Sequence, residues 1–428
     1  MKNTFTFLIL FFALSLFGQT ASLKNSPPLK EDSPSSVGVS EERLARIDKM
    51  LNESIDRGEI PGAVALVARK GKIVFFKAYG MADAESGRAF QTDDIFRIAS
   101  QTKAITSTAV MMLWEEGKFR LDDPISKYIP EFEHAFVLDS LIEEDSSFIA
   151  SPASQPITIR HLITHTSGIG YGFIDNDPFR KIYAKAGIND AWTTEALMLE
   201  DNIRKLAALP LHHNPGENFT YSEGIDVLGY LVEILSGMPL DRFLLERIFT
   251  PLGMEDSYFY LPESKYERLV PVQSPEKDRW IRFTSPYYDV DYPVKGARTY
   301  FSGGGGLCST ARDYASFLQM YLNQGELNGK RLLSRTTVQV IMANHIGDIW
   351  KNSGAHHGLA FQVIDQLGQD MGGQGSEGTF SWGGYFNTQY FADPKEQVIG
   401  ILMKQTQETP NDQTAWRFRQ LVGQCMDD

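Results

Sequence analysis

The runs of β-forming residues in this 428-residue sequence lie near its two ends, and this separation limits the folds open to the chain. Two short strands joined by a turn are predicted at 62–67 and 73–76. Comparable runs return near the C-terminus, at 361–364, 379–382, 387–392 and 397–403. The pattern between the two ends favours short helices separated by loops that contain Pro and Asp. We therefore expect one sheet assembled from both ends, a mainly helical insert, and a cleft at their junction.

Helical periodicity and the residues that begin or end helices predict the boundaries of the helices within this α+β architecture. Ser40 is a plausible N-cap for a helix with apolar residues at helical spacing. A second helix is expected from about Ser100 to Glu116, ended by Gly117. Further helices are expected at 158–165, 224–236, 240–249 and 413–424, and an acidic, Ser-rich surface excursion at 131–156. The predicted domains are an α/β sheet domain of residues 40–119 together with 300–428, and a helical insert domain of residues 120–299.

The N-terminus has the features of an export signal. Residues 1–21 place Lys2 before an apolar run that is shorter than the ~20 apolar residues of a membrane-spanning helix. This pattern predicts a signal peptide, and an uncleaved membrane anchor is the alternative. Residues 22–39 are rich in Ser and Pro and predict a flexible spacer. We expect a secreted or periplasmic protein with no stable membrane insertion after signal cleavage.

Composition excludes several classes of protein. Aromatic residues make up 12% of the chain, which argues against disorder. The formal net charge of −13 argues against a nucleic-acid binder, which needs a basic face. The two cysteines, Cys308 and Cys425, are too few for a disulfide scaffold, and the sequence does not say whether they are bridged. It leaves the oligomeric state open as well.

The first candidate for chemistry is Ser100-Gln101-Thr102-Lys103 at the start of the second predicted helix. A serine hydroxyl needs a neighbour that takes its proton, and a lysine three residues later lies on the same helix face. The helix N-terminus also favours a developing oxyanion. A second match, Ser274-Pro275-Glu276-Lys277, is flanked by Pro and charge in a loop-like context, and we set it aside.

Two later segments carry further candidates. In Tyr221-Ser222-Glu223, the phenol could act as a base if a cation such as Lys103 favoured the phenolate. In the stretch from Ser381 to Tyr385, Trp382 precedes the pair Gly383-Gly384 between two predicted strands. Paired glycines in a strand indicate close approach of a backbone or a ligand, and an edge strand there could offer an N–H group to an oxyanion.

In this order and at these separations, the three elements resemble the motifs of the serine β-lactamase-related hydrolases. This family includes class C β-lactamases, DD-peptidases and family VIII carboxylesterases. Other stretches that look similar are 157–168, 214–217 with 226–229, and 303–307 with 309–313. The resemblance covers residues 40–425 and implies a β-lactamase/transpeptidase-like fold, in which helices flank an antiparallel sheet with an inserted, mainly helical domain.

The resemblance also implies roles for single residues. Ser100 would be the acylated nucleophile, and Lys103 and Tyr221 would share the general-base and general-acid work, in an order that the sequence does not settle. Tyr385 would give the backbone N–H that joins that of Ser100 in the oxyanion hole. The acyl or alcohol pocket would be shaped by Trp382 beside Gly383 and Gly384, with Tyr171 lining it as well.

Departures from the β-lactamase pattern bear on the substrate. Class C β-lactamases carry Asn where this chain has Glu223, and Lys-Thr-Gly where it has Trp382-Gly383-Gly384. The tryptophan form resembles family VIII esterases, so we favour a carboxylesterase acting on a small-molecule ester or amide. A β-lactamase or D-amino-acid peptidase with the same nucleophile is the alternative. A non-catalytic module that binds cell-wall peptides is a third hypothesis.

Cofactor and metal sites are not predicted. His161 and His165 are four residues apart, but a zinc hydrolase motif needs Glu where Leu162 stands. The adjacent pairs His212-His213 and His356-His357 are expected in solvated loops. Gly303–Gly306 lacks the Lys-Ser/Thr ending of a phosphate-binding loop, and no Gly-x-Ser-x-Gly nucleophile elbow occurs.

Overall fold

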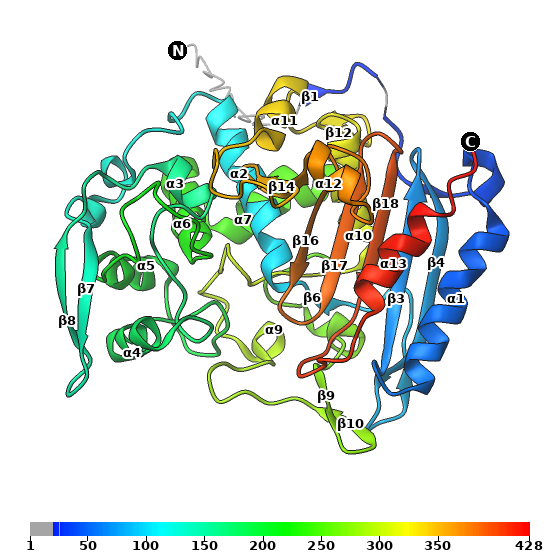
Figure 1. The fold of residues 1–428 in the computed structure, drawn as a ribbon, viewed down its shortest axis with the longest axis horizontal. Coiled ribbons are helices and arrows are strands. Elements are labelled where there is room, and N and C mark those ends of the chain that lie inside the picture. The colour runs from blue at the N-terminus through cyan, green and yellow to red at the C-terminus, as the bar shows by residue number, and fades with distance from the viewer. Residues whose placement is uncertain (1–19, 25) are drawn as a thin grey trace, which may run out of the picture.

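A long, mostly antiparallel sheet forms one half of the molecule in the computed structural model, which describes residues 20–24 and 26–428. Its strand order is β14-β15-β16-β17-β18-β3-β4-β2, with β5 beside β4 (Figure 1). The two-residue strand β2 pairs in parallel with β4, and every other pairing in this sheet is antiparallel. The bounds are β2 Lys30–Glu31, β3 Gly62–Arg69, β4 Lys72–Asp83, β5 Arg88–Ala89, β14 Ala355–His357, β15 Gln362–Ile364, β16 Phe380–Gly384, β17 Thr388–Asp393 and β18 Val398–Met403.

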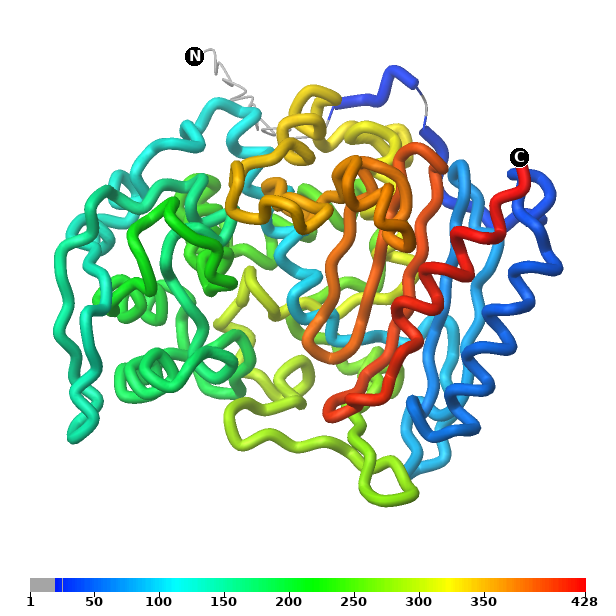
Figure 2. Tube along the Cα trace, viewed as in Figure 1, coloured from blue at the N-terminus to red at the C-terminus, as the bar shows by residue number. Residues whose placement is uncertain are grey.

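The two ends of the chain meet at the pairing of β3 with β18. Val64 lies opposite Met403 and Arg69 opposite Val398, so the predicted sheet built from both ends is confirmed. Figure 2 shows the blue and orange-red segments side by side. Every residue of β3 is buried, because helices cover both faces of the sheet there and the strand can be apolar throughout.

Alternate residues of β3 pack into two different cores. Val64 and Leu66 belong to the large core with the helices α2 (Thr102–Glu115) and α10 (Ala311–Leu322). Ala65 and Val67 face the opposite layer, made by α1 (Glu41–Asp56) and α13 (Thr414–Gly423). The Ser40 hydroxyl accepts a hydrogen bond from the backbone N–H of Arg43, as expected for the N-cap of α1.

The middle of the chain forms a second body of short elements beside the sheet (Figure 1). The predicted helix at 224–236 is α6, which packs against α2. The segment 131–156, expected as a surface excursion, contains a hairpin of β7 and β8 whose side chains are partly buried or exposed. The hairpin is held to the rest of the chain by the bond from Leu138 N–H to the Leu211 carbonyl. The elements here are η3 Ile125–Lys127, η4 Pro130–Phe132, β7 Phe136–Ile142, β8 Ser147–Pro152, α3 Ile159–Ile163, α4 Asp177–Ala186, α5 Leu199–Ala207, α6 Gly224–Ser236, α7 Leu240–Leu244, η5 Leu245–Phe249, α8 Thr250–Leu252, η6 Glu263–Arg268, β9 Gln273–Glu276, β10 Arg279–Arg282 and α9 Tyr292–Lys295.

Several shorter strands and helices complete the fold beside the large sheet and the middle segment of the chain. Strand β6 pairs with β11, and β12 pairs with β13, which also pairs with β1. Both cysteines are buried and free, Cys308 in β11 and Cys425 beyond α13. The remaining bounds are β1 Thr20–Ala21, η1 Pro34–Val37, β6 Phe96–Arg97, η2 Ala99–Gln101, β11 Cys308–Ser309, β12 Glu326–Leu327, β13 Lys330–Arg331, α11 Arg335–Met342 and α12 Gln366–Met371.

The N-terminal predictions meet the structure only in part. The predicted signal peptide, residues 1–21, lies almost wholly outside the described residues. Part of the predicted spacer is tied to the body, because β2 pairs with β4 and the buried Arg69 donates to the carbonyl of Val37. Within the described ranges, no helix is both long and apolar enough to cross a bilayer.

Candidate active site

The predicted nucleophile lies at the start of the helix that runs through the core. Ser100 belongs to the short turn η2, and α2 follows directly. Residues 102–113 of α2 are all buried, so the helix start is held on every side. Ala99, just before the serine, has a φ of 43°, a left-handed conformation that only surrounding structure can impose on a non-glycine residue. The strained residue and the buried helix together fix the position of Ser100.

Lys103 lies one turn further along α2 and is 5% exposed. Its Nζ donates to the hydroxyl of Tyr171 at 2.7 Å and to the carbonyl of Gly304 at 2.6 Å. Among the described residues, no carboxylate lies within ion-pair distance of this ammonium group. Lys103 is therefore a desolvated cation held by two neutral oxygens, one from each of two segments distant in sequence.

Tyr221 presents its ring to that cation. The Lys103 Nζ lies 4.6 Å from the centroid of the Tyr221 ring, a cation–π distance. Tyr171 and Trp382 stack on the same ring, with centroids at 5.6 Å and 5.8 Å, and His165 lies at 4.7 Å. The Tyr221 hydroxyl is buried and has no hydrogen-bond partner in the described part of the chain. The ring is fixed by packing, while its oxygen is left available to another group.

Three acidic side chains lie behind the lysine and the tyrosine. Asp190 accepts hydrogen bonds from the backbone N–H groups of Gly172 and Phe173 at 2.8 Å and 2.9 Å, which holds the loop after Tyr171. Burial, then the negative charge of Asp190, raises the pKa of Glu223 well above its usual range. Burial also raises the pKa of Asp226, which accepts from the N–H of Gly304. Burial therefore favours the neutral form of Glu223, at the position where class C β-lactamases carry Asn.

Two histidines that we had not predicted as site residues line the cavity beside Ser100. His165 is hydrogen-bonded through Nδ1 to the hydroxyl of Ser222, and so holds the Tyr221 segment. His357, expected in a solvated loop, is buried at the end of β14, and its Nδ1 donates to the carbonyl of Gly358. Burial lowers the pKa of His165 well below its usual range and that of His357 to about 4, so both rings are neutral at pH 7. The residues next to His165 and His357 in the sequence form no motif that would predict a position in the active site.

The third predicted motif lies on strand β16, which packs against η2. A Cβ at Gly384 would lie 2.4 Å from the carbonyl oxygen of Ile98, so only glycine permits this close approach. The side chain of Trp382 faces Tyr221, whereas Gly383 faces the other side of the sheet. Tyr385 follows the strand with its side chain 37% exposed, and its predicted oxyanion N–H stays a prediction.

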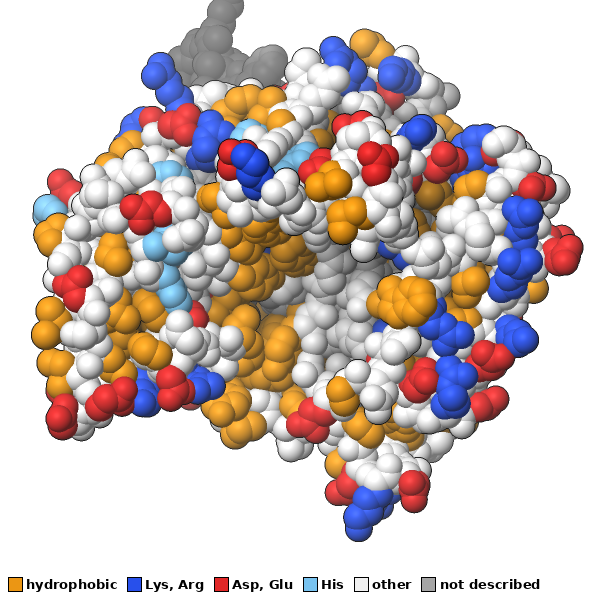
Figure 3. Space-filling view, viewed as in Figure 1, with side chains coloured by type: hydrophobic (Ala, Val, Ile, Leu, Met, Phe, Trp, Pro, Cys, Tyr) orange, Lys and Arg blue, Asp and Glu red, His pale blue; other side chains and the backbone are white. Residues whose placement is uncertain are grey.

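A cluster of aromatic side chains surrounds Tyr385. Ring centroids of Phe173, Trp192 and Tyr288 lie 5.6 Å, 5.4 Å and 6.0 Å from that of Tyr385. Trp192 is fixed by a hydrogen bond from its indole N–H to the carbonyl of Gly305. These side chains make an apolar wall next to the predicted oxyanion position. Figure 3 shows a deep hollow in this face of the molecule with hydrophobic side chains along one side.

The structure thus brings together Ser100, Lys103, Tyr171, Tyr221 and Trp382. Ser100, Lys103 and Trp382 line one small cavity of about 10 Å³, close to the space that one water molecule needs. In the described residues, no group of three or more His, Cys, Asp or Glu side chains is arranged to hold a metal ion. His161 instead closes the N-terminus of α3, where its Nδ1 accepts from the N–H of Thr158.

A family model described as Beta-lactamase matches residues 47–424. The chain belongs to the β-lactamase family. The chain is 34% identical to protein Rv1367c of Mycobacterium tuberculosis, and the match covers 83% of this chain and 88% of Rv1367c. Esterase EstB of Burkholderia gladioli is 30% identical, over 85% of this chain and 90% of the esterase.

The solved structure of EstCE1, described as a hydrolase with promiscuous acyltransferase activity, superimposes with a TM-score of 0.77. That pair is 27% identical, over 89% of this chain and 98% of EstCE1. The predicted family resemblance and the β-lactamase/transpeptidase-like α+β fold are both confirmed. The family is one of hydrolases, and esterases are among the relatives of this member.

Proposed function

We propose that this β-lactamase-family protein is an exported serine carboxylesterase that acts through an acyl-enzyme on Ser100. The observation that carries the proposal is Trp382, which stacks on Tyr221 where a β-lactamase has a lysine. Of the described residues that line the catalytic cavity, Lys103 alone is cationic, since burial keeps both histidines neutral. The site therefore suits an ester without a carboxylate near its reacting carbonyl better than it suits a β-lactam.

In the proposed reaction, each proton transfer is assigned to a named oxygen or nitrogen atom of the site. The Ser100 Oγ attacks the ester carbonyl carbon and loses its proton to the phenolate oxygen of Tyr221, which has no hydrogen-bond partner among the described residues and becomes a neutral phenol. The Lys103 Nζ, which donates to Tyr171 and Gly304 and lies 4.6 Å from the centroid of the Tyr221 ring, supplies the positive charge that stabilises the phenolate. The C–O bond to the alcohol then breaks, and the phenol returns the proton to the leaving oxygen.

Deacylation repeats these steps with water in place of serine. Water gives a proton to the same phenolate and attacks the acyl carbon, and the Ser100 oxygen leaves with that proton. The products are the carboxylic acid and the free enzyme. The aromatic wall around Tyr385 favours an apolar acyl group, since a charged one would lose its hydration there.

Acyl transfer to the protein tests the proposal most directly. The purified protein is exposed in parallel to p-nitrophenyl butyrate, nitrocefin and a D-Ala-D-Ala peptide, and mass spectrometry then identifies the acyl group on Ser100. We expect turnover of the ester and its loss in Ser100→Ala. The matched control Ser274→Ala changes the other Ser-x-x-Lys, which lies in the hairpin of β9 and β10, and it should keep full activity. Full activity in Ser100→Ala would refute the mechanism.

The same experiment separates the alternatives. Preferential acylation by nitrocefin or by the D-Ala-D-Ala peptide would indicate a β-lactamase or a peptidase. Labelling of the protein by none of the three compounds would favour a cell-wall-binding module. Export is tested separately, by detecting the mature N-terminus in the medium or the periplasm of the expressing cell.

A further inference from the structure

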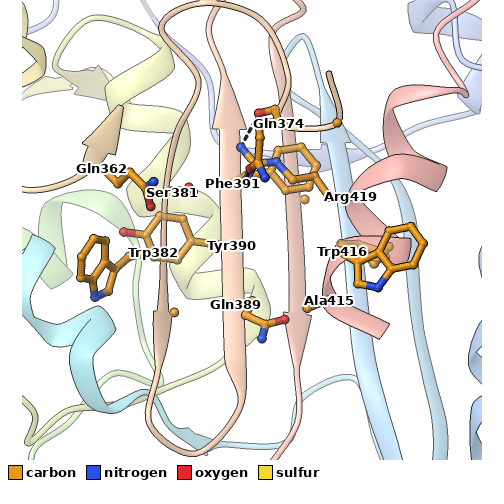
Figure 4. Close-up of a pocket in the computed structure, with 14 residues that line it drawn as sticks. Gln362, Gln374, Ser381, Trp382, Gln389, Tyr390, Phe391, Ala415, Trp416 and Arg419 are labelled. Carbon is orange, nitrogen blue, oxygen red and sulfur yellow. Dashed lines mark hydrogen bonds between the residues drawn. The ribbon is translucent and has the colours of Figure 1, made fainter. Parts of the chain in front are cut away.

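A second concave site lies on the opposite face of strand β16 from the catalytic serine. Helix α13 packs against β18 and reaches Phe391 of β17, whereas none of the described helices packs closely against the outer face of β16 (Figure 1). The result is a groove of about 440 Å³ between these strands and α13. Figure 4 shows it with Trp382 at one side and Trp416 at the other. No step of the proposed reaction uses the outer face of the sheet.

The side chains that line this groove are mostly neutral hydrogen-bonding groups and aromatic rings. Gln362, Gln374 and Gln389 contribute amides, which both donate and accept, and Ser381 contributes a hydroxyl. Trp416 projects from α13 with 58% of its surface exposed, which is unusual for so large an apolar side chain. No Asp or Glu side chain is among the described lining residues. This set matches a neutral molecule with many hydroxyl groups and an apolar ring face.

Two lining groups still have free hydrogen-bonding capacity. Arg419 lies over the ring of Phe391 at 5.0 Å and donates from Nη1 to Gln374 Oε1, which fixes its guanidinium group. Its Nε is buried and has no partner among the described residues, and the same is true of the Oε1 atom of Gln389. One donor and one acceptor beside the groove are therefore buried and unpaired. Leaving such atoms unpaired costs free energy, which a hydroxyl-bearing ligand would recover once side-chain movement brought it into contact with them.

The groove and the catalytic cavity meet at β16. Trp382 and Tyr390 line both of them. On β16, strand β15 pairs with Phe380 and Ser381, and no described strand pairs with that edge of β16 beyond Ser381. A Cβ at Gly383 would lie 3.3 Å from the carbonyl oxygen of Thr388 and 3.6 Å from the Gln389 side chain, so glycine leaves room for that amide side chain beside the strand. For one substrate to occupy both sites, the molecule joined to Ser100 has to pass this edge of β16 to reach the outer groove.

We propose that this groove binds the sugar part of the substrate, so that the enzyme hydrolyses acyl esters of carbohydrates. The Trp416 indole packs against the apolar face of a sugar ring, and the amides pair with its hydroxyls. The acyl group lies on the Ser100 side of β16, against the aromatic wall. This inference rests on the proposed esterase function.

The experiment compares two kinds of ester on the same enzyme. Hydrolysis of monoacetylated xylobiose, cellobiose and maltose is followed by acetate release, and hydrolysis of p-nitrophenyl acetate is followed by absorbance. For each variant, the measured quantity is the ratio of kcat/KM for the best sugar ester to kcat/KM for p-nitrophenyl acetate. We expect this ratio to fall tenfold or more in Trp416→Ala and in Gln389→Ala, mainly through KM.

Matched controls come from outside the groove. Gln366→Ala removes an exposed glutamine whose amide bonds Asp370, and Met198→Ala removes an apolar side chain that is 53% exposed. Both should keep the wild-type ratio. A ratio that stays within twofold in both groove variants, or wild-type enzyme that prefers hexyl acetate to every acetylated disaccharide, would overturn the inference. If no ester at all is cleaved, including p-nitrophenyl acetate, it is the proposed function that fails.

Discussion

Replacing Tyr221 by Phe separates catalysis from stability in this site. The Tyr221 ring is packed by Tyr171, Trp382 and His165, and phenylalanine keeps those contacts. The hydroxyl is buried without a partner in the described chain, so its removal breaks no hydrogen bond. We therefore expect Tyr221→Phe to fold as well as the wild type and to lose most of its activity.

The structure sets the sizes of both effects. An unpaired buried hydroxyl costs about 1–3 kcal/mol, so the free energy of unfolding should stay the same or rise by up to that amount. Loss of the acid–base group should lower kcat/KM by ~10²–10⁴-fold. The matched variant Tyr171→Phe removes the acceptor that Lys103 uses at 2.7 Å. Because that bond involves a buried charge, Tyr171→Phe should lower the free energy of unfolding by about 1.5–3 kcal/mol.

Urea unfolding, followed by far-ultraviolet circular dichroism, and ester hydrolysis give the two readouts. Both are measured on wild-type protein, Tyr221→Phe and Tyr171→Phe under the same conditions. Destabilisation of Tyr221→Phe by more than Tyr171→Phe would show that the hydroxyl holds the site together. Full activity of Tyr221→Phe would show that it is not the proton acceptor.

Two further predictions concern buried titratable groups. The folded-state pKa of His357 is about 4, against 6.5 for an unperturbed histidine, so the unfolded chain takes up a proton first as the pH falls. The contribution of neutral His357 to the free energy of unfolding is fully present above pH 6.5 and is lost as the pH falls to about 4, a change of about 3 kcal/mol. In urea unfolding at a series of pH values, His357→Asn should show a weaker dependence of the free energy of unfolding on pH over this range. The same pH dependence in His357→Asn as in the wild type would contradict the lowered pKa of His357. Lys404, which is fully buried, pairs with Asp412, and Asn387 in the turn after Tyr385 also bonds that carboxylate. Asp412→Ala should lower the free energy of unfolding by about 3–5 kcal/mol, because it leaves the buried charge of Lys404 without a partner. Adding Lys404→Met removes that charge and should recover part of the loss. A double variant that is less stable than Asp412→Ala would contradict this prediction.

The sheet could be predicted from sequence because its signals are local. The continuous apolar run of β3 and the short β-rich runs near the C-terminus identify buried strands, and the structure places them side by side. Helix α6 was predicted with its observed bounds, since Gly237 ends a clear amphipathic pattern in a left-handed conformation. The hairpin of β7 and β8 was missed because its side chains are only partly buried, so no strong alternation marks it.

Some residues of the candidate site could also be predicted from local sequence motifs, and others could not. Ser100, Lys103, Tyr221 and Trp382 lie in motifs with recognisable spacing, and the sequence was enough to select them. Asp190 and His357 carry no such motif. Their positions depend on the packing of loops, and so do the burial and the lowered or raised pKa values of the groups around them.

By itself, the sequence determined the family, the sheet built from both ends, and the pairing of a serine and a lysine on one helix face, since a helix places residues three apart together. Only the tertiary structure decided what Lys103 contacts. Its two acceptors, Tyr171 and Gly304, lie 68 and 201 residues away along the chain, and no local pattern can specify contacts over such distances. The groove on the outer face of β16 was decided in the same way, because its shape depends on where α13 packs against the sheet.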